Sequence, residues 1–310
     1  MSVSQGKILV IRGGAIGDFV LTLPALAALR RQFPRTHLEV LGYPHIAGLA
    51  LAAGTVNEVR SIEAGALAGF FARNGNLAPH LVDYFSGFDL IISYLYDPDL
   101  IFQTNVRRCS RAQFIAGPHR PDEAGDLHAT ETFLKPLERL AIFEADPVPH
   151  LEVARAPEAA LLPGRWLAVH PGSGSERKNW PEGHWLELLR HVVTTTEFNL
   201  LLAGGEAERG RLERLERMLP TTRIRLMQGQ PLPELAGWLA ACRAFIGHDS
   251  GISHLAAAVD LPALILWGDT VENVWRPRAR QLTVLRSSDG LAGLSVPVVI
   301  RHVEALLQGV

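Results

Sequence analysis

Residues 7–18 read KILVIRGGAIGD, in which the apolar run Ile8–Ile11 leads directly into a glycine-rich turn. A continuous apolar run of this length is typical of a strand buried on both faces of a parallel sheet. The apolar-periodic segment 18–33 predicts a helical region, with Pro24 near a helix start because an interior proline would break the hydrogen-bond ladder. Strand, glycine turn and helix in this order predict the first unit of a doubly wound α/β sheet.

The same alternation continues along the chain and predicts the rest of the fold. Further apolar runs predict strands at 38–41, 88–96, 166–169, 199–203, 224–226, 244–246 and 263–267. Periodic segments predict helices at 181–194, 206–218, 253–259 and 298–308. Between them, the stretch 144–164 contains four prolines and has no clean period, so it predicts a linker. A chain of 310 residues is long for one core, and we expect two domains, residues 1–150 and 151–310.

Composition excludes several classes of protein. A net charge of −2 disfavours a broad nucleic-acid-binding field, and 47% hydrophobic residues argue against disorder. The two cysteines, Cys109 and Cys242, give neither a disulfide framework nor zinc-ligand spacing. The apolar run near the N-terminus is too short for a signal peptide or a membrane span. We therefore expect a soluble, cytoplasmic protein that can still work at a membrane surface.

Three glycine-bearing turns join a predicted strand to a predicted helix: 13–18, 170–181 and 247–254. Each ends at a helix N-terminus, where free N–H groups and the helix dipole favour an anion. Any one such turn is more often only a turn. The first lacks the spacing of a dinucleotide fingerprint and is followed by no Walker lysine, so an NAD(P)-binding protein is the weakest alternative.

Two charged residues in these turns suggest chemistry. Asp18 closes the first turn, where a carboxylate suits a general base; alternatively, it only interacts with the helix N-terminus. Lys178 in the second turn can place its charge over an anion held near Ser173 and Gly174; alternatively, it is a solvated lysine beside Arg177.

The third turn contains Ser250 and Gly251 at the start of a helix and His254 one turn later. Glycine there lets the backbone approach phosphate oxygens without a Cβ in the way, and the small alanines that follow allow close packing under a ligand. His254 lies on a helix face that can look at a ligand, although a lone histidine at such a position is more often a core residue.

A D-x-D triplet and a group of basic residues lie in the first half of the chain. Asp97 and Asp99 have the spacing with which some transferases hold a divalent cation, but a proline-containing loop explains the triplet, and we expect no metal. Four arginines follow, near His119 and His128: Arg107, Arg108, Arg111 and Arg120. They predict either a patch for a phosphorylated glycolipid or a solvated basic face.

Four ordered motifs together resemble the bacterial heptosyltransferases, glycosyltransferase family 9. They are the opening segment 7–30 with its Leu-Pro-Ala-Leu, HPGS with KNWP at 170–181, DSGISHLAAA at 249–258, and WGDT at 267–270. The resemblance implies a GT-B fold, in which two doubly wound, Rossmann-like parallel-sheet domains face a cleft. It also implies inverting sugar transfer, typically of heptose from ADP-heptose to the lipopolysaccharide inner core.

The resemblance assigns roles by position. Asp18 is then the general base in an acceptor-side N-terminal domain, and Lys178 a diphosphate ligand in a nucleotide-sugar-binding C-terminal domain. It adds further donor contacts: Asp249 at the sugar, Ser250 and Gly251 at the phosphates, Glu208 at the ribose with Glu206 as its rival, and Met227 with Gln228 near the adenine.

Our interpretation is thus an inverting glycosyltransferase without cofactor or metal, using an ADP-sugar and a glycolipid acceptor at the cytoplasmic face of the inner membrane. Another nucleotide-sugar or acceptor on the same scaffold is the first alternative. A non-catalytic nucleotide-binding protein is the second. Segment 65–79 matches no expected element, and the sequence names neither sugar nor acceptor.

Overall fold

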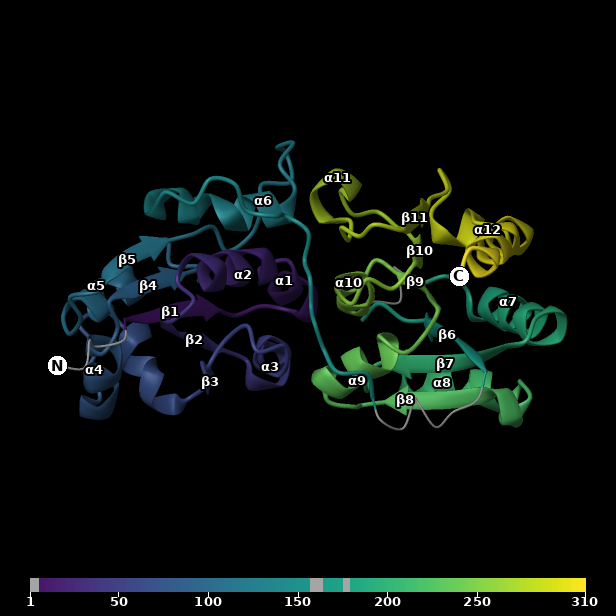
Figure 1. Ribbon diagram of the computed structural model, residues 1–310, viewed down its shortest axis with the longest axis horizontal. Coiled ribbons are helices and arrows are strands. Elements are labelled where there is room, and N and C mark those ends of the chain that lie inside the picture. The colour runs from purple at the N-terminus through teal and green to yellow at the C-terminus, as the bar shows by residue number, and fades with distance from the viewer. Residues whose placement is uncertain (1–5, 157–163, 175–178) are drawn as a thin grey trace. The chain divides into compact units, whose positions relative to one another are not determined.

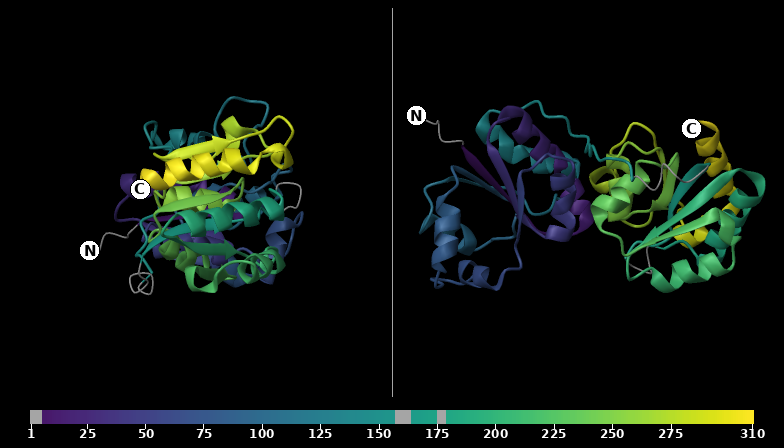
Figure 2. Two further views of the ribbon diagram at one scale, coloured as in Figure 1. Left: turned by 90° about the vertical axis from the view of Figure 1, so that its right-hand side faces the viewer. Right: turned by 60° about the horizontal axis from the view of Figure 1, so that its bottom comes forward.

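The computed structural model describes residues 6–156, 164–174 and 179–310, and it divides the chain into two compact units, Met1–Pro147 and Val148–Val310. Each unit is a fully parallel β-sheet with helices on both of its faces (Figures 1 and 2). Two doubly wound α/β domains are therefore confirmed.

The N-terminal unit has five strands in the order β3-β2-β1-β4-β5. Their bounds are β1 Lys7–Arg12, β2 His37–Gly42, β3 Glu58–Ser61, β4 Leu90–Ser93 and β5 Gln113–Ala116. The predicted first strand is the central one, and Leu9, Val10 and Ile11 are completely buried. Because β1 pairs with β2 on one side and β4 on the other, the strand order reverses beside β1, and ligands bind open α/β sheets at the carboxyl ends of strands at such a switch point.

Helices connect these strands: α1 Ile16–Val20, α2 Leu23–Gln32, α3 Pro44–Ala52, α4 Pro79–Ser86, α5 Ile101–Arg107 and α6 Ala129–Leu134, with 3₁₀ turns at Gly65–Phe71 and Lys135–Leu140. The helical region expected at 18–33 is two helices. The Thr22 hydroxyl donates to the Asp18 carbonyl at the break, and Pro24 lies in the first turn of α2, as its missing N–H requires. Within segment 65–79, Phe70 packs on Phe85 with ring centroids 4.7 Å apart.

The C-terminal unit has six strands in the order β11-β10-β9-β6-β7-β8, so its switch point lies between β6 and β9. The strands are β6 Arg165–His170, β7 Phe198–Gly204, β8 Ile224–Gln228, β9 Ala244–His248, β10 Ala263–Leu266 and β11 Leu282–Leu285. The helices are α7 Glu182–Thr195, α8 Arg209–Arg217, α9 Leu232–Leu239, α10 Gly251–Ala258, α11 Glu272–Trp275 and α12 Val296–Gln308. The first five strands of this sheet have the same order as those of the N-terminal sheet, and β11 adds a sixth strand at one edge.

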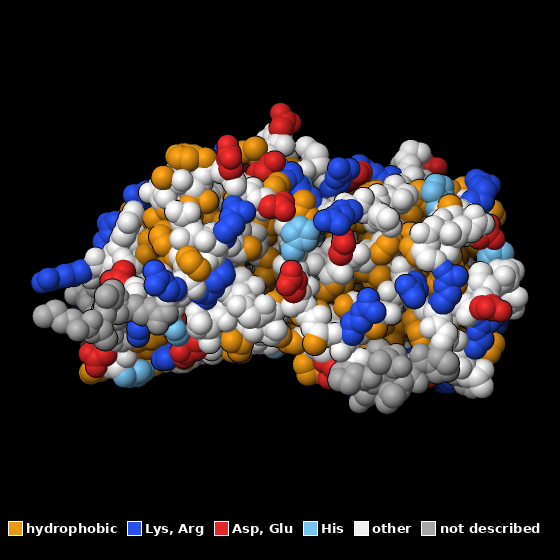
Figure 3. Space-filling model, viewed as in Figure 1, with side chains coloured by type: hydrophobic (Ala, Val, Ile, Leu, Met, Phe, Trp, Pro, Cys, Tyr) orange, Lys and Arg blue, Asp and Glu red, His pale blue; other side chains and the backbone are white. Residues whose placement is uncertain are grey.

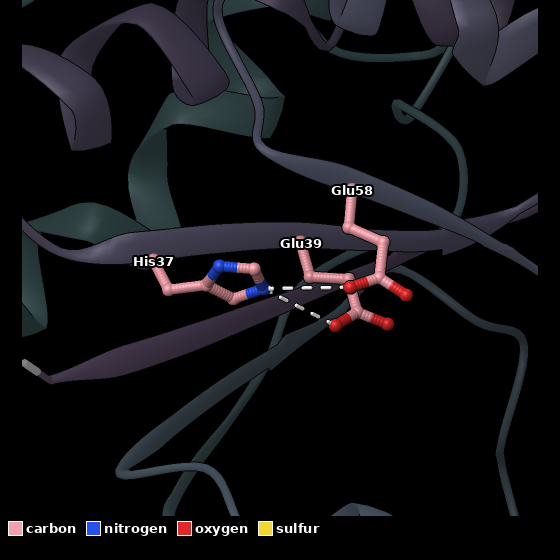
Figure 4. A group of neighbouring side chains, drawn as sticks. All are labelled: His37, Glu39 and Glu58. Carbon is pink, nitrogen blue, oxygen red and sulfur yellow. Dashed lines mark ion pairs between the residues drawn. The ribbon is translucent and has the colours of Figure 1, made fainter.

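Three charged or titratable side chains, His37, Glu39 and Glu58, lie together at the amino ends of β2 and β3 (Figure 4). The switch-point turns lie at the opposite, carboxyl ends of the strands. His37 Nε2 is 3.5 Å from Glu39 and 3.8 Å from Glu58, a spacing that would suit a metal ion. However, Arg60 already pairs with both carboxylates at 3.5 and 3.4 Å, and the Tyr84 hydroxyl donates to Glu39 at 2.6 Å. We therefore interpret the group as a cross-strand charge network that stabilises the edge strand β3.

Acidic and basic side chains are interspersed on the face shown in Figure 3, as the small net charge predicts. Across the described residues, no helix combines the length and the apolar character needed to cross a membrane.

Candidate active site

The turn after β1 places Asp18 at the switch point of the N-terminal sheet. Its Oδ2 accepts a hydrogen bond from the Ala15 N–H at 3.0 Å, which caps α1. Gly14 has φ +106°, and a Cβ there would lie 2.8 Å from Asp18 Oδ2, so glycine is what lets the carboxylate fold back over the turn. Only one carboxylate oxygen is used by the cap, and the side chain remains 25% exposed. Asp18 therefore can cap the helix and accept a proton.

Arg12, at the end of β1, contacts this turn through hydrogen bonds. Its guanidinium donates to the carbonyl of Asp18 at 3.1 Å and to that of His119 at 2.9 Å, and it lies 4.4 Å from the centroid of the Phe133 ring. Nη2 is also 3.7 Å from Asp18 Oδ1. Burial lowers the pKa of Arg12. The sequence marked Arg12 only as part of a motif; its position as the last residue of a buried strand was the signal that it points into the site.

Asp18 lines a pocket of about 540 Å³ that lies entirely within the N-terminal unit. Its other walls include Glu63, Phe71, Tyr96 and His119. Tyr96 is 71% exposed and its ring packs against His119 with centroids 4.6 Å apart. Aromatic rings can pack against the apolar faces of a sugar ring, and charged side chains can bind its hydroxyl groups. The lining of this pocket is therefore suited to a sugar. Tyr96 belongs to none of the sequence motifs that predicted site residues.

The structure separates the four predicted acceptor arginines. Arg120 lines the pocket and pairs with Glu123 at 2.8 Å. Arg107 ends α5, Arg108 donates to the carbonyl of Gly75 at 2.9 Å, and Arg111 precedes β5. These three lie toward the amino ends of the strands, whereas Asp18 lies at the carboxyl ends. His128, also near them in sequence, is buried and caps α6 through Nδ1.

The D-x-D residues have structural partners. Asp97 accepts hydrogen bonds from the N–H groups of Phe102 and Gln103 at 3.1 and 2.9 Å, and so caps α5. Asp99 lies 3.6 Å from Arg73. The interpretation of the triplet as a loop feature agrees with these contacts.

In the C-terminal unit, the turn after β6 closes around Glu208. The buried carboxylate accepts from the N–H groups of Gly174 at 3.3 Å and Gly205 at 2.9 Å. A Cβ on Gly172 would lie 2.1 Å from Glu208 Cγ, so this approach requires glycine. The rival Glu206 has a side chain 92% exposed, 4.0 Å from Arg209. The structure thus brings Glu208, and not Glu206, to the turn.

Four further predicted donor contacts are Ser173, Lys178, Met227 and Gln228. Ser173 Oγ donates to Asn179 Oδ1 at 2.9 Å. Lys178 lies outside the described residues. Met227 is buried near the end of β8, and the following Gln228 is half-buried.

The turn after β9 carries the remaining residues that the sequence predicts to contact the donor. Ser250 is the N-cap of α10, which begins at Gly251, and its Oγ lies 3.2 Å from His170 Nδ1 at the end of β6. Asp249 accepts a hydrogen bond from the hydroxyl of Thr270 in the WGDT loop. His254 is buried within α10. The turns after β6 and β9 are thus linked within one unit, as expected at a switch point.

Two buried histidines, His170 and His248, end β6 and β9 and were not identified as site residues from the sequence. Burial lowers the pKa of His170 to about 4 and that of His248 to about 3, so both rings are neutral at physiological pH. Their place as the last residues of apolar strands, directly before glycine turns, was the available signal.

Comparison with known proteins identifies the chain. A family model described as glycosyltransferase family 9 (heptosyltransferase) matches residues 139–293, half of the chain. Lipopolysaccharide heptosyltransferase 1 of Pseudomonas aeruginosa is 33% identical over 135 residues, which cover 43% of this chain and 33% of that protein. Much of that relative therefore lies outside the alignment.

Two solved structures have the same fold. A glycosyltransferase family 9 protein from Veillonella parvula matches with a TM-score of 0.81 and 18% identity, over 100% of this chain and 99% of its own. ADP-heptose LPS heptosyltransferase II of Escherichia coli matches with a TM-score of 0.80 and 19% identity, over 98% and 99%. The fold is GT-B, and the chain belongs to glycosyltransferase family 9, the heptosyltransferase family.

Proposed function

We propose that this glycosyltransferase moves heptose from ADP-heptose, with inversion, onto an inner-core acceptor of lipopolysaccharide. The N-terminal unit takes the acceptor and the C-terminal unit takes the donor. One observation carries the proposal: the partly exposed Asp18 carboxylate lies in the wall of an aromatic-lined pocket at a switch point.

The acceptor hydroxyl is a poor nucleophile until a base removes its proton, and Asp18 is the proposed base. The hydroxyl oxygen attacks the anomeric carbon while the bond from that carbon to the diphosphate oxygen breaks on the opposite face. One displacement therefore inverts the configuration, and the proton ends on Asp18.

The leaving ADP is stabilised in the C-terminal unit. Lys178 supplies a positive charge, and the Ser250–Gly251 helix start supplies N–H groups. Glu208, at the neighbouring turn, is the proposed ribose contact. These groups take the role that a divalent cation has in other transferases, so no metal is required.

The acceptor is a glycolipid, so the enzyme works at the cytoplasmic face of the inner membrane. Tyr96 and His119 offer ring faces to the acceptor sugar, and Arg120 offers a charge to its phosphate. The alternative is another nucleotide-sugar or acceptor on the same scaffold.

Incubation with ADP-heptose and a truncated core glycolipid tests the activity, and release of ADP that depends on the glycolipid is expected. A nucleotide-binding protein without catalysis would release none. Thermal unfolding tests which nucleobase the donor site prefers. A ligand at about 100 times its Kd stabilises a fold by roughly 2.7 kcal/mol, so ADP should raise the Tm more than UDP. A larger response to UDP would contradict the adenine assignment.

A further inference from the structure

The imidazole of His248 joins the turn after β6 to the end of β9. Its Nε2 accepts a hydrogen bond from the Trp180 N–H at 2.8 Å, and its Nδ1 lies 3.1 Å from the carbonyl oxygen of Gly172. Gly172 and Trp180 flank the stretch 173–179. One side chain, fully buried, therefore binds the backbone on both sides of that stretch.

The two contacts determine the protonation of the ring. A backbone N–H only donates, so Nε2 carries no proton; a carbonyl oxygen only accepts, so Nδ1 carries it. Burial lowers the pKa of His248 to about 3, which keeps this neutral tautomer at physiological pH. Only a neutral imidazole makes both bonds at once.

The ring is itself held in place by the core. Trp185 packs edge-on against it, with centroids 5.3 Å apart and planes at 90°. Trp180 is anchored through its indole N–H, which donates to the carbonyl of Leu294 at 2.8 Å. Both tryptophans are fully buried. The contact between His170 and Ser250 provides a second link between the same two turns.

We propose that His248 is a positioning residue for the donor diphosphate, because it fixes Gly172 and Trp180 relative to the Ser250 turn. The inference rests on the proposed function, in which both turns contact the leaving diphosphate. Electrostatic stabilisation of a leaving group depends on donors that are already in place. A residue that only filled space would need no donor and acceptor on opposite sides of its ring.

The test compares His248→Leu, which removes both bonds, with His248→Gln, whose amide keeps a donor and an acceptor. His302→Gln is the control, since His302 is half-buried on α12 and its Nδ1 lies 2.9 Å from the Val298 carbonyl oxygen of the same helix. Two quantities are measured well below the Tm: the Kd for ADP, and the hydrogen exchange of the peptide that contains Trp180.

We expect His248→Leu to weaken ADP binding by about 5- to 100-fold, as the loss of two hydrogen bonds implies. His248→Gln should lose less, the control nothing, and exchange at Trp180 should quicken in His248→Leu. Faster exchange with an unchanged Kd for ADP would show a structural role only, and unchanged exchange would show that the ring does not hold the turn; either overturns the inference. Failure of the wild-type protein to bind ADP would instead overturn the proposed function and remove the ligand that His248 is inferred to position.

Discussion

The turn after β1 and the paired turns after β6 and β9 occupy the same place in two sheets of the same strand order, yet they differ in what they leave open. The first leaves a carboxylate, Asp18, 25% exposed in a pocket. In the second, the carboxylate of Glu208 is buried against two N–H groups, and the neighbouring histidines are neutral. One scaffold therefore presents a partly exposed carboxylate in one unit and a carboxylate held by backbone N–H groups in the other.

Replacement of the base is the strongest test of this difference. Asp18→Asn keeps an oxygen that can accept from the Ala15 N–H, so α1 remains capped and the Tm should hardly change. The amide cannot take the acceptor proton, and a positioned base typically supplies about 10²–10⁴-fold. We expect kcat to fall at least about 100-fold, with ADP affinity unchanged.

Glu63, a second carboxylate in the same pocket, is the rival base. Glu63→Gln should lower kcat by less than about tenfold. If Asp18→Asn retained more than about a tenth of wild-type turnover, Asp18 would have no part in proton removal.

Use of the donor should depend on a positive charge in the C-terminal unit and not on a general base. Lys178→Ala removes a charge-assisted contact worth roughly 1.5–3 kcal/mol, so kcat/KM should fall about 10- to 150-fold. Arg177→Ala, one residue away, is the control and should cost little. Equal losses from the two variants would place the diphosphate contact elsewhere.

The aromatic wall of the N-terminal pocket should affect the acceptor alone. Stacking on an aromatic ring is worth roughly 0.5–1.5 kcal/mol, so Tyr96→Ala should raise the acceptor KM about 2- to 12-fold and leave the donor KM unchanged. Phe143→Ala is the control, because Phe143 is equally exposed in the same unit but does not line the pocket. A change in donor KM, or none in acceptor KM, would contradict this assignment.

The sequence predicted the strands that are buried on both faces, such as β1, β6 and β9, because these are continuous apolar runs. It did not predict β3, β5 or β11, since all three are four-residue edge strands with partly exposed residues and little apolar signal. The contacts that shape the site were also hidden. Arg12 meets a carbonyl 107 residues away and His248 an N–H 68 residues away, and such neighbours follow from strand order.

Removal of metal ions should produce the smallest effect of all. A large effect would show that the C-terminal turns do not neutralise the leaving group by themselves. If Lys178 and the helix start at Gly251 neutralise the diphosphate, the C-terminal turns need no cation. EDTA should then leave turnover within about twofold, against the several kcal/mol that a catalytic metal supplies. The D-x-D residues are the alternative site for a cation. However, Asp97 caps α5 and Asp99 lies near Arg73, so both carboxylates already have partners within the protein. The measurement is initial rate with and without EDTA, followed by addition of Mg²⁺ or Mn²⁺. If EDTA abolished activity and either ion restored it, a bound cation, and not the turns after β6 and β9, would neutralise the charge of the leaving diphosphate.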